Sequence, residues 1–149
     1  MYGDSPQIKR RTDQLREQGV ELHALADRLV AQTEAVGWRG RAAAALHGRI
    51  GERAATLRDL GELHQSASDA LASHRHAVDE AKERIAEVQQ RAERLVEGAR
   101  ERAAAIERDN ADRAPELRVA PAEDDAVLLA FEPPPDGHKD WLTVDLPGL

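Results

Sequence analysis

The chain has 149 residues, a formal net charge of −7 and only 3% aromatic residues, so any core must be built from Leu, Val, Ile and Ala. Residues 1–109 are nearly balanced, with 18 positive and 19 negative groups, whereas residues 110–149 carry 3 positive and 9 negative groups. This acidic excess argues against nucleic acid as the main partner, because phosphate binding needs a net basic face. Without cysteine, disulfides, thiol nucleophiles and cysteine-based zinc sites are excluded.

The N-terminal residues lead directly into a charged stretch, without the apolar segment that a cleavable secretory signal requires. No part of the chain approaches the run of about 18 apolar residues that would cross a membrane. If the protein is exported, we therefore expect a route that reads a folded or helical feature.

The first predicted helix covers about residues 6–36. Ser5 followed by Pro6 is typical of a helix start, because the hydroxyl can accept a free backbone N–H and proline fits the first turn. Apolar residues then recur at every seventh position with polar residues between them, which predicts a helix with one apolar stripe. This stripe consists of Ile8, Leu15, Leu22, Leu29 and Val36.

A chain reversal is predicted at residues 37–40, where Gly37 and Gly40 supply the backbone freedom that a tight turn requires. A second helix is predicted over about residues 41–110, because an alanine-rich run follows Gly40 and no proline occurs before Pro115. Apolar heptads continue along most of this helix. One seam position holds Ile50, Leu57, Leu71, Val78, Ile85, Ala92, Ala99 and Ile106, and the other holds Leu60, Ala67, Ala81, Val88 and Leu95.

The two predicted helices differ in length, at roughly 45 Å and roughly 100 Å with a rise of about 1.5 Å per residue. The first helix therefore leaves part of the second uncovered, and an exposed apolar seam normally marks a protein interface. Either another chain covers the seam or the second helix breaks at residues 61–69, where weak helix formers cluster. The heptad keeps its phase there, which favours continuity. The expected partner interface consists of Leu71, Val78, Ile85, Val88 and Leu95.

These elements predict an all-α fold. Residues 1–112 form an antiparallel helical hairpin with a long second helix, which pairs with another hairpin in a four-helix bundle or coiled coil. Residues 113–149 form a separate acidic, proline-rich tail with two short apolar runs of strand-like composition. These runs either dock on the helices, remain disordered, or add to a partner's sheet edge or groove.

No arrangement of residues supports catalysis, so we predict that the protein is not an enzyme and uses no cofactor. The sequence has no Gly-rich phosphate loop after a strand and no nucleophile elbow. His74 and His76 are two residues apart on a predicted helix and face different directions, so they are poorly placed to chelate a metal. We interpret His64 and His74 as polar seam residues that fix register or partner choice.

The most informative motif is Trp38-Arg39-Gly40, which lies at the reversal between two amphipathic helices and precedes an alanine-rich helix start. This arrangement resembles the small Trp-x-Gly proteins of type VII (ESX-like) secretion, and the similar N-terminal helical domains of longer substrates of that system. The resemblance covers about residues 6–102. It implies that hairpins pair as homodimers or heterodimers into four-helix bundles, with Trp38 and Gly40 at the turn.

The family usually carries a Tyr-x-x-x-Asp/Glu export signal near the end of the second helix. This chain has no tyrosine there, and the nearest match runs from His76 to Glu80. The resemblance then implies that a partner carries the signal, so that this chain is an escorted substrate or a chaperone-like partner. It would be secreted or displayed at the cell surface without a signal peptide, and otherwise cytoplasmic.

Two alternatives follow from the same residues. Trp38 could cap a helical hairpin in an unrelated coiled-coil protein. The protein could also be a cytoplasmic adaptor or toxin-neutralising protein whose acidic tail binds a basic groove through Phe131 and Trp141.

Overall fold

The computed structural model describes residues 4–149, and every regular element in this range is helical. The chain divides into two compact units, Asp4–Ala77 and Val78–Leu149, which we call the two-helix unit and the tail unit. The elements are α1 (Ser5–Ala35), α2 (Arg41–Ala111), the 3-10 helix η1 (Pro115–Leu117), α3 (Glu123–Leu129) and the 3-10 helix η2 (Lys139–Thr143). The two apolar runs of the tail with strand-like composition thus contribute to α3 and η2 instead of strands.

Helix α1 begins and ends close to the residues expected from the sequence. Its N-cap is Asp4, whose carboxylate accepts the backbone N–H of Gln7 at 3.1 Å, so the expected cap Ser5 is instead the first helical residue. After α1, Gly37 and Gly40 adopt φ angles of 65° and 102°. These angles lie in the left-handed region that glycine adopts without strain, which explains why the reversal occurs between them.

Helix α2 is continuous over 71 residues, so the expectation that the second helix does not break is confirmed. The weak helix formers of residues 61–69 are held by packing: Gly61 is buried and Ser68 is 0% exposed. The Ser68 hydroxyl donates a hydrogen bond across to the Thr12 carbonyl oxygen at 3.0 Å. Tertiary contact therefore outweighs the low helix propensity of these residues.

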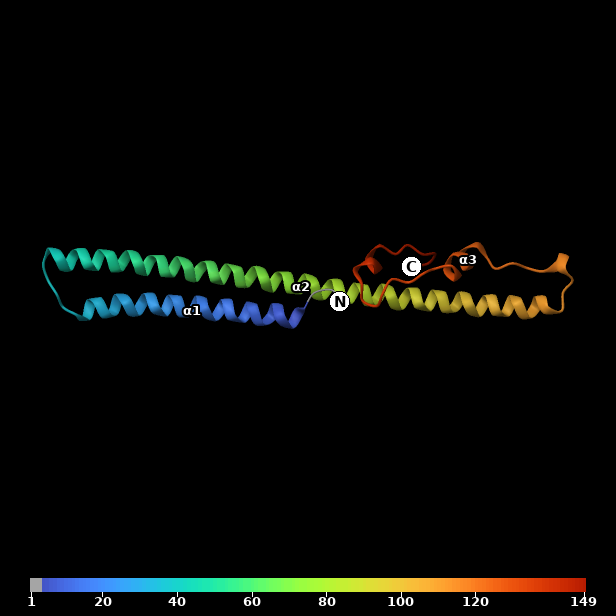
Figure 1. The fold of residues 1–149 in the computed structure, drawn as a ribbon, viewed down its shortest axis with the longest axis horizontal. Coiled ribbons are helices and arrows are strands. Elements are labelled where there is room, and N and C mark those ends of the chain that lie inside the picture. Colours follow the sequence, from blue (N-terminus) through green and yellow to red (C-terminus); the bar gives the residue numbers. More distant parts are fainter. Residues whose placement is uncertain (1–3) are drawn as a thin grey trace. The chain divides into compact units, whose positions relative to one another are not determined.

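Small residues form the centre of the contact between α1 and α2, which run antiparallel in the two-helix unit (Figure 1). They recur at heptad spacing on both helices, and a Cβ added at Gly61 would lie 3.1 Å from the carbonyl oxygen of Gly19. The backbones are therefore in close contact. The buried small residues at this spacing are Thr12, Gly19 and Ala26 on α1, and Ala54, Gly61 and Ser68 on α2; Ala43 is also buried, near the start of α2.

The predicted apolar stripe of α1 does not lie at the centre of this contact. Leu15, Leu22 and Leu29 are half-buried, and Val36 is 53% exposed. The physical reason is size, because the small residues allow a close approach that displaces the larger side chains to the flank of the helix pair.

The tail unit has a core made jointly by α2 and the segment that follows it. Figure 1 shows this segment returning along the C-terminal part of α2. Apolar side chains of α3 and η2 pack there against the helix. The rings of Phe131 and Trp141 meet edge to face, with centroids 6.1 Å apart. The buried members of the core are Ile85, Ala92, Ala99, Leu128, Trp141 and Leu146.

We predict that Gly61→Ala destabilises the protein by about 1–3 kcal/mol, because overpacking a close contact costs that much. The new methyl would lie 2.8 Å from the His23 ring and 3.1 Å from a backbone oxygen. The matched control is Gly48→Ala on the same helix, where a Cβ meets nothing within 4 Å. That change should stabilise the protein by about 0.5–1 kcal/mol through helix propensity. Urea unfolding followed by circular dichroism measures both, and equal effects of the two changes would contradict the close contact.

Candidate partner interface

The two-helix unit has one apolar side. On each helix, large apolar residues occur four positions before the buried small residues, except that His64 stands before Ser68. In an antiparallel pair, equivalent flanks of both helices lie on the same side. Leu22 and Leu25 of α1 accordingly line one surface hollow together with Leu60 and His64 of α2. We call this side the apolar face. It consists of Ile8, Leu15, Leu22, Leu25, Leu29, Val36 and Trp38, with Leu46, Ile50, Leu57, Leu60 and Leu71.

The opposite side of the two-helix unit carries charged residues, with Val20 as an isolated exposed apolar residue. There Arg58 pairs with Asp27 at 2.8 Å, and Arg16 lies 3.8 Å from Asp69. Solvent-exposed pairs such as these contribute little stability, but they keep that side hydrated. The pair of helices is therefore amphipathic as a unit, with water on the polar side and an apolar surface on the other.

The reversal motif adds Trp38 to the turn end of the apolar face. Trp38 is 65% exposed and lines a hollow of about 250 Å³ with Leu29, Leu46 and Ile50. Gly40 sets the backbone of the turn through its positive φ. An indole exposed beside leucines is the kind of residue that partner surfaces bury.

The seam of α2 in the tail unit is covered by the chain itself. Val78 is 6% exposed and Ile85 is 2% exposed, and Val88 and Leu95 pack against the core that contains Ile85. The expectation that the seam lies bare from Leu71 to Ala99 is therefore wrong. The physical reason is that the tail supplies its own apolar residues, Leu128, Trp141 and Leu146, to the core that contains Ile85, Ala92 and Ala99.

Of the five residues expected at the partner interface, only Leu71 belongs to the two-helix unit, where it is half-buried on the apolar face. The other four contribute to the tail unit. The heptad seam of α2 is continuous in sequence but has two parts in the structure. The tail covers the part that includes Ile85 and Ala99, whereas the part that ends at Leu71 is open.

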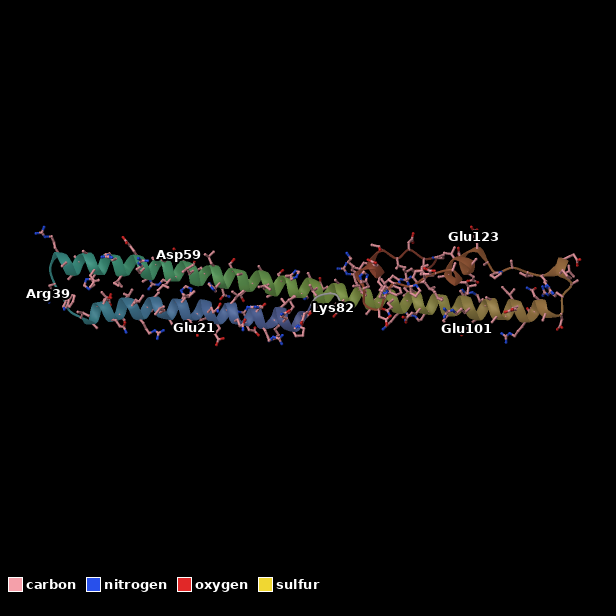
Figure 2. The ribbon with its side chains drawn as sticks, viewed as in Figure 1. Glu21, Arg39, Asp59, Lys82, Glu101 and Glu123 are labelled. Atoms are coloured by element: carbon pink, nitrogen blue, oxygen red, sulfur yellow. The ribbon has the colours of Figure 1, made fainter. Side chains whose placement is uncertain are left out.

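Polar contacts fix the tail on α2. Both oxygens of the Asp125 carboxylate accept hydrogen bonds from Arg102 Nε, at 2.9 and 3.1 Å. These hydrogen bonds, aided by the positive charge of Arg102, hold the pKa of Asp125 below its usual value. Arg91 also donates a hydrogen bond to the carbonyl oxygen of Gly148 at 2.9 Å. Figure 2 shows side chains filling the space between α2 and the returning chain.

Phe131 and Trp141, the residues expected to bind a partner through the tail, instead pack within the tail unit. Trp141 is 2% exposed, and its indole N–H donates a hydrogen bond to the carbonyl oxygen of Pro135 at 3.1 Å. Phe131 is half-buried against the core. Their side chains stabilise the docked tail.

His76 and Glu80, the signal-like residues, are both exposed on α2. Their spacing of four residues places them on one side of the helix. Within residues 4–149, no cluster of three or more His, Asp or Glu side chains is suited to hold a metal ion. Over the same range, no helix combines the length and apolarity needed to cross a membrane.

Two groups of residues that shape the two units were not predicted from the sequence. The small residues of the helix contact were hidden by the larger leucines, although their heptad spacing was a readable signal. The pair of Arg102 and Asp125 was hidden because its members are 23 residues apart on different elements. The available signal for this pair was Arg102 itself, because a cation that interrupts an apolar heptad seam needs a partner.

Comparison with known proteins returned no match: no family profile, curated protein sequence or solved structure is similar to this chain.

We predict that Asp125→Asn loosens the docked tail at neutral pH, because it removes the carboxylate that Arg102 binds. Since folding lowers the pKa of Asp125 from about 3.8, the stabilisation is present above that pH and is lost as the pH falls through the lower folded value. The wild-type tail should therefore loosen in acid, and the variant should lack that step.

The measurement uses a Trp38→Phe background, which leaves Trp141 as the single tryptophan. Its fluorescence should shift to the red when the tail detaches from α2. Asp124→Asn is the matched control, because Asp124 is exposed and adjacent to Asp125. Equal urea midpoints for the two variants would contradict the role assigned to Asp125.

Proposed function

We propose that this protein is a non-enzymatic partner-binding protein whose apolar face pairs with a second helical hairpin to complete a four-helix bundle. The observation that carries this proposal is the contrast between the two sides of the two-helix unit. Leu25 and Leu60 are 40% and 41% exposed on the apolar face, whereas ion pairs occupy the opposite side. Apolar side chains that are exposed together on one side of a helix pair are typical of a protein interface.

A second hairpin fits this surface better than a single helix does. The exposed apolar residues come from both α1 and α2 and are arranged in parallel rows. Two further helices laid over these rows would bury both rows at once, which is the packing of a four-helix bundle. The bound hairpin would also reach Trp38, whose ring would then be enclosed at the end of the bundle.

We further propose that the protein acts as a type VII (ESX-like) secretion substrate, or as the partner or chaperone of such a substrate. Support comes from the placement of Trp38 and Gly40 at the reversal between the two helices. The residues His76 and Glu80 are accessible on α2, yet they lack the tyrosine of the usual signal. A partner that carries the complete signal is therefore part of the proposal.

The alternative function, an adaptor that binds through its acidic tail, has weaker support. Such an adaptor needs Phe131 and Trp141 to be accessible to a partner. Trp141 is instead almost completely buried, and Phe131 packs against it.

We predict that Leu22→Asp and Leu57→Asp, made separately, abolish pairing, because each would bury an unpaired charge in the bundle. Val20→Asp is the matched control: Val20 is 61% exposed and directly follows Gly19, on the polar side of α1. The measurement is co-expression with each Trp-x-Gly hairpin protein of the same genome, followed by co-purification and light scattering.

The expected result is a complex of defined mass that survives the change at Val20 and is lost with either leucine change. Pairing that tolerates both leucine changes would remove the apolar face from the proposal. Appearance of the chain in the culture medium only when the secretion system is intact would distinguish the type VII assignment from an unrelated coiled-coil protein.

A further inference from the structure

Two cations, Arg11 and Arg53, lie within the rows of the apolar face, whereas Arg28 lies at its rim, where its guanidinium donates a hydrogen bond to the Ala24 carbonyl oxygen. Arg11 and Arg53 each directly precede a buried small residue, Thr12 or Ala54, which is the position that Leu25 and Leu60 occupy elsewhere on the face. Among the described residues, neither of these two arginines has an ion-pair or hydrogen-bond partner. Both are exposed. An arginine placed among leucines without a carboxylate is a charge that a partner must satisfy when it covers the face.

Carboxylates in the two-helix unit lie elsewhere. Asp27 and Asp69 belong to the polar side and form ion pairs there. Glu21 lies at the rim of the apolar face, and Figure 2 shows Glu21 and Asp59 on sides of α1 and α2 that point away from the contact between the helices. Asp4 shares the heptad position of Arg11, but its carboxylate caps α1.

The tail unit provides an internal precedent for how an arginine at this heptad position of α2 is paired. Arg102 follows Arg53 by 102 − 53 = 49 residues, or seven heptads, so both arginines occupy the same heptad position of one continuous helix. At Arg102 the covering segment brings buried apolar residues, Leu128 and Trp141, together with the carboxylate of Asp125. The covering segment thus buries the apolar residues of α2 and also pairs with the Arg102 guanidinium.

We propose that the partner of the apolar face is a different helical hairpin, which presents apolar side chains and a carboxylate that pairs with Arg53, with a second carboxylate near Arg11. This proposal rests on the proposed function and names the chemistry of its partner. A second copy of this chain fits less well, because its apolar face would bring two more arginines between the leucines, and its one nearby carboxylate, Glu21, lies only at the rim.

The test uses this chain as its own probe. The variant Arg11→Glu/Arg53→Glu keeps every apolar residue of the face and replaces its two cations with carboxylates. Wild type, variant and an equimolar mixture are compared by sedimentation equilibrium at neutral pH. We expect the mixture to associate at least about tenfold more tightly than either chain alone, because only the mixture pairs opposite charges. The association should weaken as the salt concentration rises.

The control is Arg10→Glu/Arg41→Glu, which changes the net charge equally but lies off the apolar face, at exposed positions of α1 and α2. If the control mixture associates as tightly as the test mixture, the effect is one of net charge and the proposal fails. A wild-type dimer as stable as the mixture would identify a second copy as the partner, which overturns this inference and leaves the proposed function intact. Absence of association in every sample overturns the carboxylate pairing, whereas the proposed function is judged by the co-expression experiment with the leucine variants.

Discussion

The structure depends on one constraint, which is that the apolar stripe of α2 is longer than α1. Helix α2 has 71 residues and α1 has 31, so α1 can accompany less than half of it. Apolar surface left in water is unfavourable by about 25 cal/mol per Å², and a long uncovered stripe would promote aggregation. The tail resolves this for the C-terminal part of α2 by supplying a tryptophan, two leucines and a carboxylate to the same seam. The first part of the stripe has no such cover among residues 4–149 and forms one half of the apolar face.

The close contact between α1 and α2 determines what that face looks like. Because Gly19 and Gly61 bring the backbones together, the leucines cannot interdigitate between the helices and are displaced to one flank. A contact made of leucines would have buried the stripe and left a less apolar surface. The small residues therefore position the interface, although none of them belongs to it.

Much of the fold was readable from the sequence, and the reasons for the failures are physical. Heptad phase and the lack of proline predicted the continuity of α2, and Gly37 with Gly40 predicted the reversal. The apolar stripe of α1 was predicted correctly, but its position at the flank of the helix contact was not. Periodicity indicates which side of a helix is apolar, but it does not indicate how closely two helices approach. The docked tail was left open, because its prolines and acidic charge are typical of disorder. The deciding contacts of Trp141 and Asp125 are long-range and leave no local pattern.

The most direct test of this division of the stripe is thiol labelling, for which the natural chain provides a background without cysteine. Ala67 is exposed and directly precedes Ser68, as Leu60 of the apolar face precedes Gly61, whereas Ala92 is 0% exposed in the core of the tail unit, so a Cys at each position reports on one part of the stripe. We expect the Ala67→Cys thiol to react rapidly with a maleimide and the Ala92→Cys thiol slowly, until Trp141→Ala is added and its rate rises. Equal rates for the two thiols in the otherwise intact chain would contradict the account, because the tail would then not cover its half of the stripe.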